Sequence, residues 1–231
     1  MEVLLISDTH GKHGLLSHPL PKADMIIHAG DIGEHQWDTR NFLSWFHELP
    51  YKYKVFIAGN HDKWIERDLD NFYHYYDYYR HKRSEGNGRM KFLFDQTYEV
   101  EGIKIYGSPW TRNLPSWAFQ VPDENATKLW AKIPDDTDIL ITHGPAYGIG
   151  DAVSEQMLRG REDPHVGCKA LLERVKEVKP KIHVFGHIHE GAGLHCDIEG
   201  VKSVNASVLD ENYYFYRKDP KTTADPYVIT I

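Results

Sequence analysis

Five short clusters of polar residues in this sequence carry side chains of the kinds that bind metal ions. The clusters are Asp8-Thr9-His10, Gly30-Asp31, Gly59-Asn60-His61-Asp62, His143-Gly144 and Gly186-His187-Ile188-His189. Together they offer seven ligand side chains, which are Asp8, His10, Asp31, Asn60, His143, His187 and His189. Seven ligands are too many for one metal ion, but they suit two ions that share a bridging carboxylate, as in two-metal hydrolysis. The residue types therefore predict a dinuclear metal centre with hydrolytic chemistry.

The donor chemistry limits which metals such a centre would take. Four imidazoles, two carboxylates and one amide suit a divalent transition metal (Mn, Fe, Zn, Co or Ni) and fit Mg or Ca poorly. Any one of the clusters is common in turns or on surfaces, and Gly-Asp alone carries no signal. The prediction rests on the recurrence of all the clusters in one context, and it leaves the choice of metal, manganese included, open.

Each cluster stands at the C-terminal end of an apolar run. The runs are Val3–Ser7, Met25–Ala29, Tyr53–Ala58, Ile139–Thr142 and Ile182–Phe185. Nearly continuous apolar runs of this length are typical of strands buried on both faces. Because ligand sites in α/β sheets lie outside the carboxyl ends of the strands, we expect the clusters to converge there.

Further strands and helices complete the expected architecture. Strands are expected at Lys91–Phe94, Ile103–Tyr106, Gly193–Cys196, Ser203–Asn205, Tyr213–Arg217 and Tyr227–Ile231. Helices are expected at Trp37–Glu48, Trp64–Tyr76, Glu124–Ile133 and Gly167–Val178. The alternation near the N-terminus indicates an α/β fold, and the strand-rich C-terminal third favours a mixed sheet or a two-sheet sandwich. No repeat or linker divides the chain, so we expect a single domain over residues 1–231.

Two neighbouring segments have an unusual composition. The aromatic run Phe72–Tyr79 is interpreted as a helix that packs its rings on the core, with a stacking or partner surface as the alternative. The segment Arg80–Arg89 is rich in charge and glycine, which predicts a loop.

The ordered set of clusters resembles the calcineurin-like metallophosphoesterase superfamily. Four further stretches resemble its metallophosphoesterase-domain branch, and they are Leu49–Lys54, Ile105–Thr111, Thr142–Pro145 and His183–Gly191. The likeness runs from Ser7 to about Ser207. It implies an α/β fold in which two mixed β-sheets pack as a sandwich flanked by helices, with a dinuclear site at the strand ends.

The resemblance also implies a division of the ligands between two metal ions. The first ion would be held by Asp8, His10, Asp31 and His189, and Asp31 would bridge to a second ion held with Asn60, His143 and His187. The protein Ser/Thr phosphatases of this superfamily continue their motif as Gly-Asp-x-Val-Asp-Arg-Gly. Here Gly30-Asp31 is followed by Ile32-Gly33-Glu34-His35 without the arginine, which disfavours a protein phosphatase.

Hydrolysis would use a bridging hydroxide as the nucleophile and would need an acid for the leaving group. His61 is the expected general acid because it follows Asn60 directly, and Asp62 is expected to accept the other ring proton of His61. Substrate contacts are expected from Asn60, His61, Trp110, Arg112 and Asn113. For the last three, ordinary loop packing is the alternative.

Three other side chains have weaker assignments. Asn205 and Ser207 end a late strand and are candidates for the rim of the site. His28 lies inside an apolar run, which favours a hydrogen-bonded histidine behind the site over a metal ligand.

The sequence thus predicts a phosphodiesterase or phosphatase on small substrates such as nucleotides or cyclic nucleotides. A nuclease on single-stranded nucleic acid and a non-catalytic nucleotide-binding or scaffold module are the alternatives. Lys and Arg total 27 against 34 for Asp and Glu, and the resulting net charge of −7 disfavours duplex nucleic acid as a partner.

No apolar run is long enough for a membrane span, no signal peptide is evident, and the two cysteines fit a reducing cytoplasm. The oligomeric state is left open.

Overall fold

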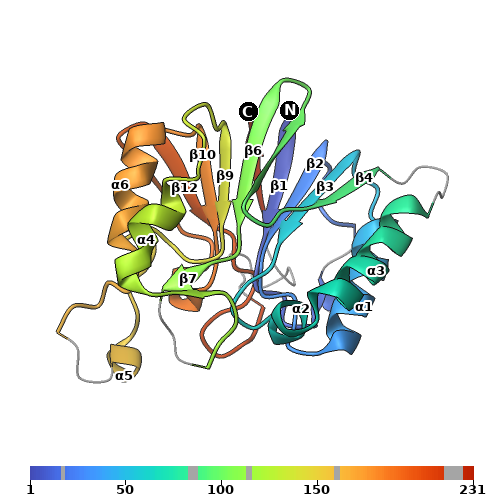
Figure 1. Cartoon of the computed structure of the whole chain (residues 1–231), viewed down its shortest axis with the longest axis horizontal. Helices are drawn as coiled ribbons and strands as arrows, with labels where there is room; N and C mark the ends of the chain where they lie inside the picture. The colour runs from blue at the N-terminus through green and yellow to red at the C-terminus, as the bar shows by residue number, and fades with distance from the viewer. Residues whose placement is uncertain (17–18, 83–87, 113–115, 159–161, 216–225) are drawn as a thin grey trace.

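Two β-sheets lie face to face in this chain, and helices cover the outer face of each sheet (Figure 1). The structure is a computed structural model, and it describes residues 1–16, 19–82, 88–112, 116–158, 162–215 and 226–231. The expectation of two mixed sheets flanked by helices is therefore confirmed.

The first sheet has the strand order β13-β1-β2-β3-β4. Its strands are β13 (Tyr227–Thr230), β1 (Glu2–Ile6), β2 (Met25–Ala29), β3 (Tyr53–Ile57) and β4 (Arg89–Phe92). Strands β1 to β4 pair in parallel, and β13 pairs with β1 in the antiparallel sense. Parallel pairing brings the carboxyl ends of β1, β2 and β3 to one edge of the sheet.

The second sheet has the order β11-β12-β10-β9-β6-β5. Its strands are β11 (His195–Ile198), β12 (Val201–Asn205), β10 (Ile182–Phe185), β9 (Ile139–Thr142), β6 (Ile103–Ser108) and β5 (Gln96–Val100). The four inner strands pair in parallel and the two edge strands are antiparallel. A short parallel pair, β7 (Thr111–Arg112) with β8 (Gln120–Val121), lies outside this sheet.

The alternation of side chains along β1 shows why its apolar run is continuous. Val3 and Leu5 pack against the second sheet, in a core shared with β9 and β10. Leu4 and Ile6 point the other way, into a core closed by the helices. From Val3 to Ile6 both faces of the strand are buried, so an apolar side chain is required on each face.

The helices divide between the two outer faces. Helices α1 (Gln36–Glu48), α2 (Lys63–Arg67) and α3 (Leu69–His81) lie beside the first sheet, while α4 (Asp123–Trp130) and α6 (Lys169–Val178) lie beside the second (Figure 1). A one-turn helix α5 (Glu155–Leu158) and the 3₁₀ turns η1 (His13–Leu15) and η2 (His189–Gly191) complete the described elements.

Several elements differ from the sequence-based expectation. The helix expected at Trp64–Tyr76 is split into α2 and α3, because Asp68 has non-helical dihedrals (φ −138°, ψ 57°). The edge strand β5 was not expected, since its Gln-Thr-Tyr-Glu-Val sequence is largely polar; it forms a hairpin with β6 through a turn with positive φ at Glu101 and Gly102. At Tyr213–Arg217 the described residues form a single bridge between Leu209 and Phe215 instead of a strand, and residues 216–217 lie outside the description.

The two segments of unusual composition lie in and after α3. In the aromatic run, Phe72 and Tyr76 are buried against the first sheet while Tyr78 is exposed, which supports the core-packing interpretation. The segment expected as a loop is partly regular, because α3 extends to His81 and β4 begins at Arg89; residues 83–87 lie outside the description. Within the described residues, no helix combines the length and the apolar composition that a membrane crossing requires.

Candidate metal centre

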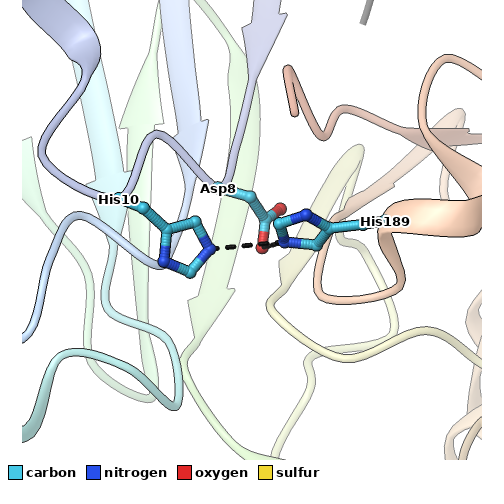
Figure 2. Close-up of side chains that lie close together, drawn as sticks. All are labelled: Asp8, His10 and His189. Atoms are coloured by element: carbon cyan, nitrogen blue, oxygen red, sulfur yellow. Dashed lines mark hydrogen bonds and ion pairs between the residues drawn. The ribbon is translucent and has the colours of Figure 1, made fainter. Parts of the chain in front are cut away.

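The two sheets meet at the edge where the polar clusters lie. A bridge between Ser7 and Ser207 joins the end of β1 to the segment after β12. The backbone N–H of His187, just after β10, donates to both carboxylate oxygens of Asp8 at 3.1 Å. Figure 2 shows that Asp8 and His10 face His189, which belongs to a segment far away in the sequence.

Four of the candidate ligands have a left-handed backbone conformation. The φ angles of Asp8, His10, Asp31 and His187 are 55°, 43°, 57° and 68°. Positive φ is uncommon for residues other than glycine and costs free energy, so it persists where the surroundings hold it in place. Here each chain segment leaves its strand in a sharp turn, and backbone bonds such as Asp8 N–H to Gly30 O (2.9 Å) and His10 N–H to Asp31 O (3.0 Å) fix the turns together.

Two positions beside the candidate carboxylates require glycine, because a side chain would not fit there. A Cβ atom on Gly186 would overlap the carboxylate of Asp8, and one on Gly59 would overlap the carboxylate of Asp31. The carboxylates therefore lie directly against the backbone, which accounts for these two glycines in the motifs.

One group of candidate ligands surrounds Asp8. The Nε2 atom of His189 lies 3.5 Å from Asp8 Oδ1 and 3.3 Å from Nε2 of His10. The other ring nitrogen of His189, Nδ1, is 2.9 Å from the carbonyl oxygen of Asp210. If Nδ1–H donates to that carbonyl, Nε2 carries the lone pair that a metal ion requires.

A second group surrounds Asp31. Nε2 of His143 lies 3.1 Å from Asp31 Oδ1 and 3.0 Å from Asn60 Oδ1, while its Nδ1 lies 2.8 Å from the carbonyl oxygen of Ala29. The second oxygen of Asp31, Oδ2, lies 3.7 Å from Nε2 of His10. The two oxygens of Asp31 thus face different histidines, which is the placement a bridging ligand needs.

Three groups of at least three His, Cys, Asp or Glu side chains have donor atoms close enough to hold one ion. Within the described residues these groups are Asp8 with His10 and His189, His10 with Asp31 and His61, and Asp8 with Asp31 and His143. His187 is in none of them, although its ring lies 5.2 Å from the ring of His143. The structure therefore brings together six of the seven predicted ligands through these groups and the Asn60 contact, and places His187 beside them.

The electrostatics of the site favour cations. Burial alone would raise the pKa of Asp31 and Asp8, but neighbouring histidines hold both pKa values well below the ordinary range. Burial would likewise lower the pKa of His143 and His189, yet Asp31 and Asp8 respectively raise each pKa to about 9. Every ion pair of these carboxylates in the described part of the chain is with a histidine. Without metal, these histidines are the groups that neutralise two buried carboxylates, and divalent cations fit the same place.

His61 has a different partner from the one expected. Its Nδ1 lies 3.3 Å from Glu34 Oε1, and its Nε2 lies 4.0 Å from Asp31 Oδ2. The carboxylate of Asp62 does not face the ring. It accepts backbone N–H groups from four residues, which are Gly59, Asp31, Ile32 and Gly33, at 2.6–3.0 Å. The expected role of Asp62 toward His61 is therefore corrected, because these donors occupy its oxygens.

The side chains of Trp110 and Arg112, which were expected to contact substrate, each have a protein partner in the structure. The indole N–H of Trp110 donates to Asp95, and the guanidinium of Arg112 pairs with Asp123 at 2.7 Å. Asn113 lies outside the described residues. Instead Trp117 lies by the site, with its ring centroid 4.1 Å from that of His61.

Asn205, Ser207 and His28, which had weaker assignments, also lie near the candidate metal centre. The amide of Asn205 donates to Ile188 O at 2.8 Å, and its side-chain oxygen accepts from the backbone of Ser207. Asn205 thus holds the segment before His189, and Ser207 is bonded to Asn205. His28 is buried and lies 3.0 Å from the hydroxyl of Thr9, as expected for a histidine behind the site.

A cleft of about 350 Å³ opens beside the candidate metal centre. Its lining is His10, Gly33, Glu34, His35, Asp38, His61 and Tyr213. Glu34, Trp117 and Tyr213 were not predicted as site residues. The position of Glu34, three residues after Asp31, was a usable signal, whereas nothing in the local sequence marked Trp117 or Tyr213.

Comparisons with known proteins agree with this geometry. A family model described as calcineurin-like phosphoesterase matches residues 1–191. Metallophosphoesterase domain-containing protein 1 of Homo sapiens is 37% identical over 225 residues, covering 90% of this chain and 66% of the human protein, just under two thirds of its length. The UPF0046 protein C25E10.12 of Caenorhabditis elegans is 35% identical over 221 residues, covering 89% of this chain and 74% of that protein.

A solved structure shows the same fold at low sequence identity. The phosphopantetheinyl hydrolase from Mycobacterium tuberculosis superimposes with a TM-score of 0.60 at 15% identity, over 97% of this chain and 95% of that one. The family model and the curated relatives, together with the sandwich and its ligand groups, lead to one conclusion. The chain belongs to the calcineurin-like phosphoesterase family.

Proposed function

We propose that this protein is a metal-dependent phosphoester hydrolase, and that it acts as a phosphodiesterase on small substrates such as nucleotides or cyclic nucleotides. The observation that carries the proposal is the placement of Asp31, whose Oδ1 faces His143 and whose Oδ2 faces His10. A buried carboxylate between two imidazole groups is suited to bridge two cations.

The proposed ligands divide between the two groups described above. One ion would be held by Asp8, His10, Asp31 and His189, and the other by Asp31, Asn60, His143 and His187. When bound, two divalent transition-metal ions lower the pKa of coordinated water and neutralise phosphoryl oxygens. The carbonyl oxygens of Ala29 and Asp210 would keep the rings of His143 and His189 in the ligating orientation.

His61 is the proposed general acid, with Glu34 as the group that positions it. Its ring lines the cleft, and Glu34 lies 3.3 Å from Nδ1, so Nε2 is the nitrogen left to face the substrate. A proton held at Nε2 can pass to the leaving oxygen of a phosphoester bound in the cleft. Asp62 acts through the backbone, because it ties the turn after β2 to the turn after β3.

The proposal is tested by metal loading and turnover measured together. Elemental analysis of the loaded protein should give about two transition-metal ions per chain, and bis(p-nitrophenyl) phosphate should be hydrolysed only by the loaded form. Asp31→Asn should lose ions from both sites, while His189→Ala should lose chiefly one. Asp38→Asn, in the same cleft but outside the ligand groups, is the matched control and should keep both ions.

One ion at saturation, or equal losses in Asp31→Asn and Asp38→Asn, would contradict the dinuclear centre. Full metal loading without turnover of any phosphoester would support the alternative, a non-catalytic nucleotide-binding or scaffold module. Preference for single-stranded DNA over mononucleotides and cyclic nucleotides would support the nuclease.

We further propose that residues 1–231 act as one phosphoesterase domain in the cytoplasm. Both cysteines are free thiols, with Cys168 buried and Cys196 exposed, which suits a reducing compartment. Fractionation of cells that make the protein tests the location, and limited proteolysis tests the single domain.

A further inference from the structure

A tight turn after β12 places an aromatic ring against the candidate metal ligands. The carboxylate oxygen Oδ1 of Asp210 accepts the backbone N–H groups of Asn212 and Tyr214, each at 2.9 Å. The backbone N–H of Tyr213 bonds to the carbonyl oxygen of Asp210, which is also the oxygen that faces Nδ1 of His189. The turn is therefore attached to a proposed ligand through a single carbonyl group.

The turn holds Tyr213 in a costly conformation and orients its ring. Tyr213 has a φ angle of 61°, which is rare for a bulky residue. Its ring centroid lies 4.9 Å from that of His10 and 5.0 Å from that of His189. The other side of the residue remains open, since 41% of Tyr213 is exposed. Tyr213 thus contacts two candidate ligands and still has exposed surface.

Tyr213 lines two hollows. It belongs to the lining of the cleft that contains His10 and His61, and also to that of a second hollow of about 430 Å³. The second hollow is lined by Lys12, Leu15, Tyr213, Tyr214 and Phe215. The ammonium of Lys12 donates to the carbonyl oxygen of Tyr213 at 2.6 Å, and it has two further N–H donors. Aromatic rings, one aliphatic side chain and one cation suit a flat aromatic group.

The order of the rings assigns the two sides of the cleft. The ring of Trp117 lies against His61, His61 lies 4.5 Å from His10, and His10 lies against Tyr213. If His61 protonates the leaving group, then that group lies on the Trp117 side. The ester group that stays on the phosphorus would then lie toward Tyr213.

We propose that the turn at residues 210–214 carries a subsite for an aromatic ester group retained on the phosphate, and that Tyr213 is the residue against which this group stacks. This inference rests on the proposed function, because it takes the metal centre as the place where the phosphate lies. It makes Tyr213 a specificity-determining residue with no part in the chemical step.

Two pairs of probes test the subsite. Bis(p-nitrophenyl) phosphate and methyl p-nitrophenyl phosphate share a leaving group and differ in the retained ester, so the ratio of their kcat/KM values reports on the subsite. Phenylphosphonate and methylphosphonate are not hydrolysed, and calorimetry on metal-loaded protein gives the ratio of their affinities without any turnover.

Tyr213→Ala should reduce both aromatic-to-methyl ratios by roughly 5- to 50-fold, since stacking against an aromatic side chain contributes an effect of that size. Tyr213→Phe keeps the ring and should keep both ratios. Tyr78→Ala removes another exposed tyrosine, on α3, and is the matched control.

Unchanged ratios in Tyr213→Ala would overturn the subsite, as would equal losses in Tyr213→Phe and Tyr213→Ala. A parallel loss of both phosphonates together with metal would also overturn it, because Tyr213 would then only support His10 and His189. If the wild-type protein prefers phenylphosphonate through Tyr213 but hydrolyses neither diester, the subsite stands and the proposed hydrolytic function fails.

Discussion

At the scale of single residues, two backbone carbonyl groups determine which ring nitrogens of His143 and His189 face the candidate metal centre. The carbonyl oxygens of Ala29 and Asp210 each face an Nδ1 atom, on His143 and His189 respectively. Each ring is thereby left with Nε2 toward a carboxylate, the arrangement that a ligating imidazole needs. The residue types indicated the candidate ligands, and these second contacts fix the orientation of two of the candidate rings.

Substitution of His61 tests whether its ring acts as the general acid. A positioned general acid contributes typically about 10²- to 10⁴-fold, so His61→Ala should lower kcat by about that factor for an alkyl leaving group. The loss should be much smaller for p-nitrophenolate, which departs without a proton. Steady-state kinetics with both substrates measures the difference.

Metal content separates this role from a ligand role, because His61 can form a group with His10 and Asp31. As a general acid, His61→Ala should keep the metal content of the wild type. Loss of an ion, or equal kinetic losses for both leaving groups, would instead identify His61 as a ligand or a structural residue. Glu34→Gln should show the same dependence on the leaving group in weaker form.

At the scale of elements, one carboxylate joins the turns that follow β2 and β3. Asp62 is fully buried and accepts the backbone N–H groups of Asp31 and Gly59, which begin these two turns. We expect Asp62→Ala to lower the free energy of unfolding by roughly 2–4 kcal/mol, since it leaves several buried donors without an acceptor. Urea denaturation measures this, with the exposed Asp70→Ala on α3 as the control. A change as small as that of Asp70→Ala would show that Asp62 does not hold the turns.

A buried lysine links β3 to the end of α1. Lys54 is fully buried and donates to the carbonyl oxygen of His47 at 2.7 Å. Burial lowers the pKa of Lys54 from 10.5 to about 8, with Glu48 opposing the shift. Between pH 8 and 10.5 the unfolded chain therefore binds more protons at this position than the native chain does. Because the unfolded chain binds more protons here, the contribution of Lys54 makes the free energy of unfolding rise with pH between 8 and 10.5.

The substitution Lys54→Met tests this linkage. It removes a buried charge, so it should raise the free energy of unfolding at pH 7 by roughly 1–3 kcal/mol. The advantage of Lys54→Met over the wild type should shrink as the pH rises from 8 to 10.5. Urea denaturation of both proteins at pH 7 and pH 10 checks this, and an equal difference at the two pH values would contradict it.

At the scale of the whole molecule, the net charge leads to a prediction about the size of the substrate. The net charge of −7 creates an unfavourable field for a polyanion, which two divalent ions would reduce without reversing. We expect small phosphodiesters to be hydrolysed with higher kcat/KM than duplex DNA. Binding of duplex DNA should also be weak and should change little with salt. A nanomolar affinity that falls steeply with salt would contradict this, since that dependence reports many phosphate contacts.

Strand β1 and the edge strand β5 show which strands could be predicted from the sequence alone and which could not. The apolar run at Val3–Ser7 predicted a buried strand, and the observed strand Glu2–Ile6 is buried from Val3 to Ile6, because positions buried on both faces of a sheet must be apolar. The same local rule located β2, β9 and β10 correctly. It missed β5, since an edge strand exposes polar side chains and its pairing with β6 is decided by a hairpin.

The candidate ligands were named from residue type and spacing, because a metal needs specific donor atoms and sharp turns after strands supply them in short motifs. The partners of those residues were not predictable in the same way. Glu34 replaced Asp62 as the neighbour of His61, Trp117 took the place expected of Trp110, and Tyr213 was not considered. Adjacency along the chain suggested Asp62, but its carboxylate turns toward buried backbone N–H groups, which must be satisfied. Residue types and motifs thus determined which side chains are candidates for metal binding, while contacts between distant segments, which arise only on packing, decided which side chains lie beside the candidates.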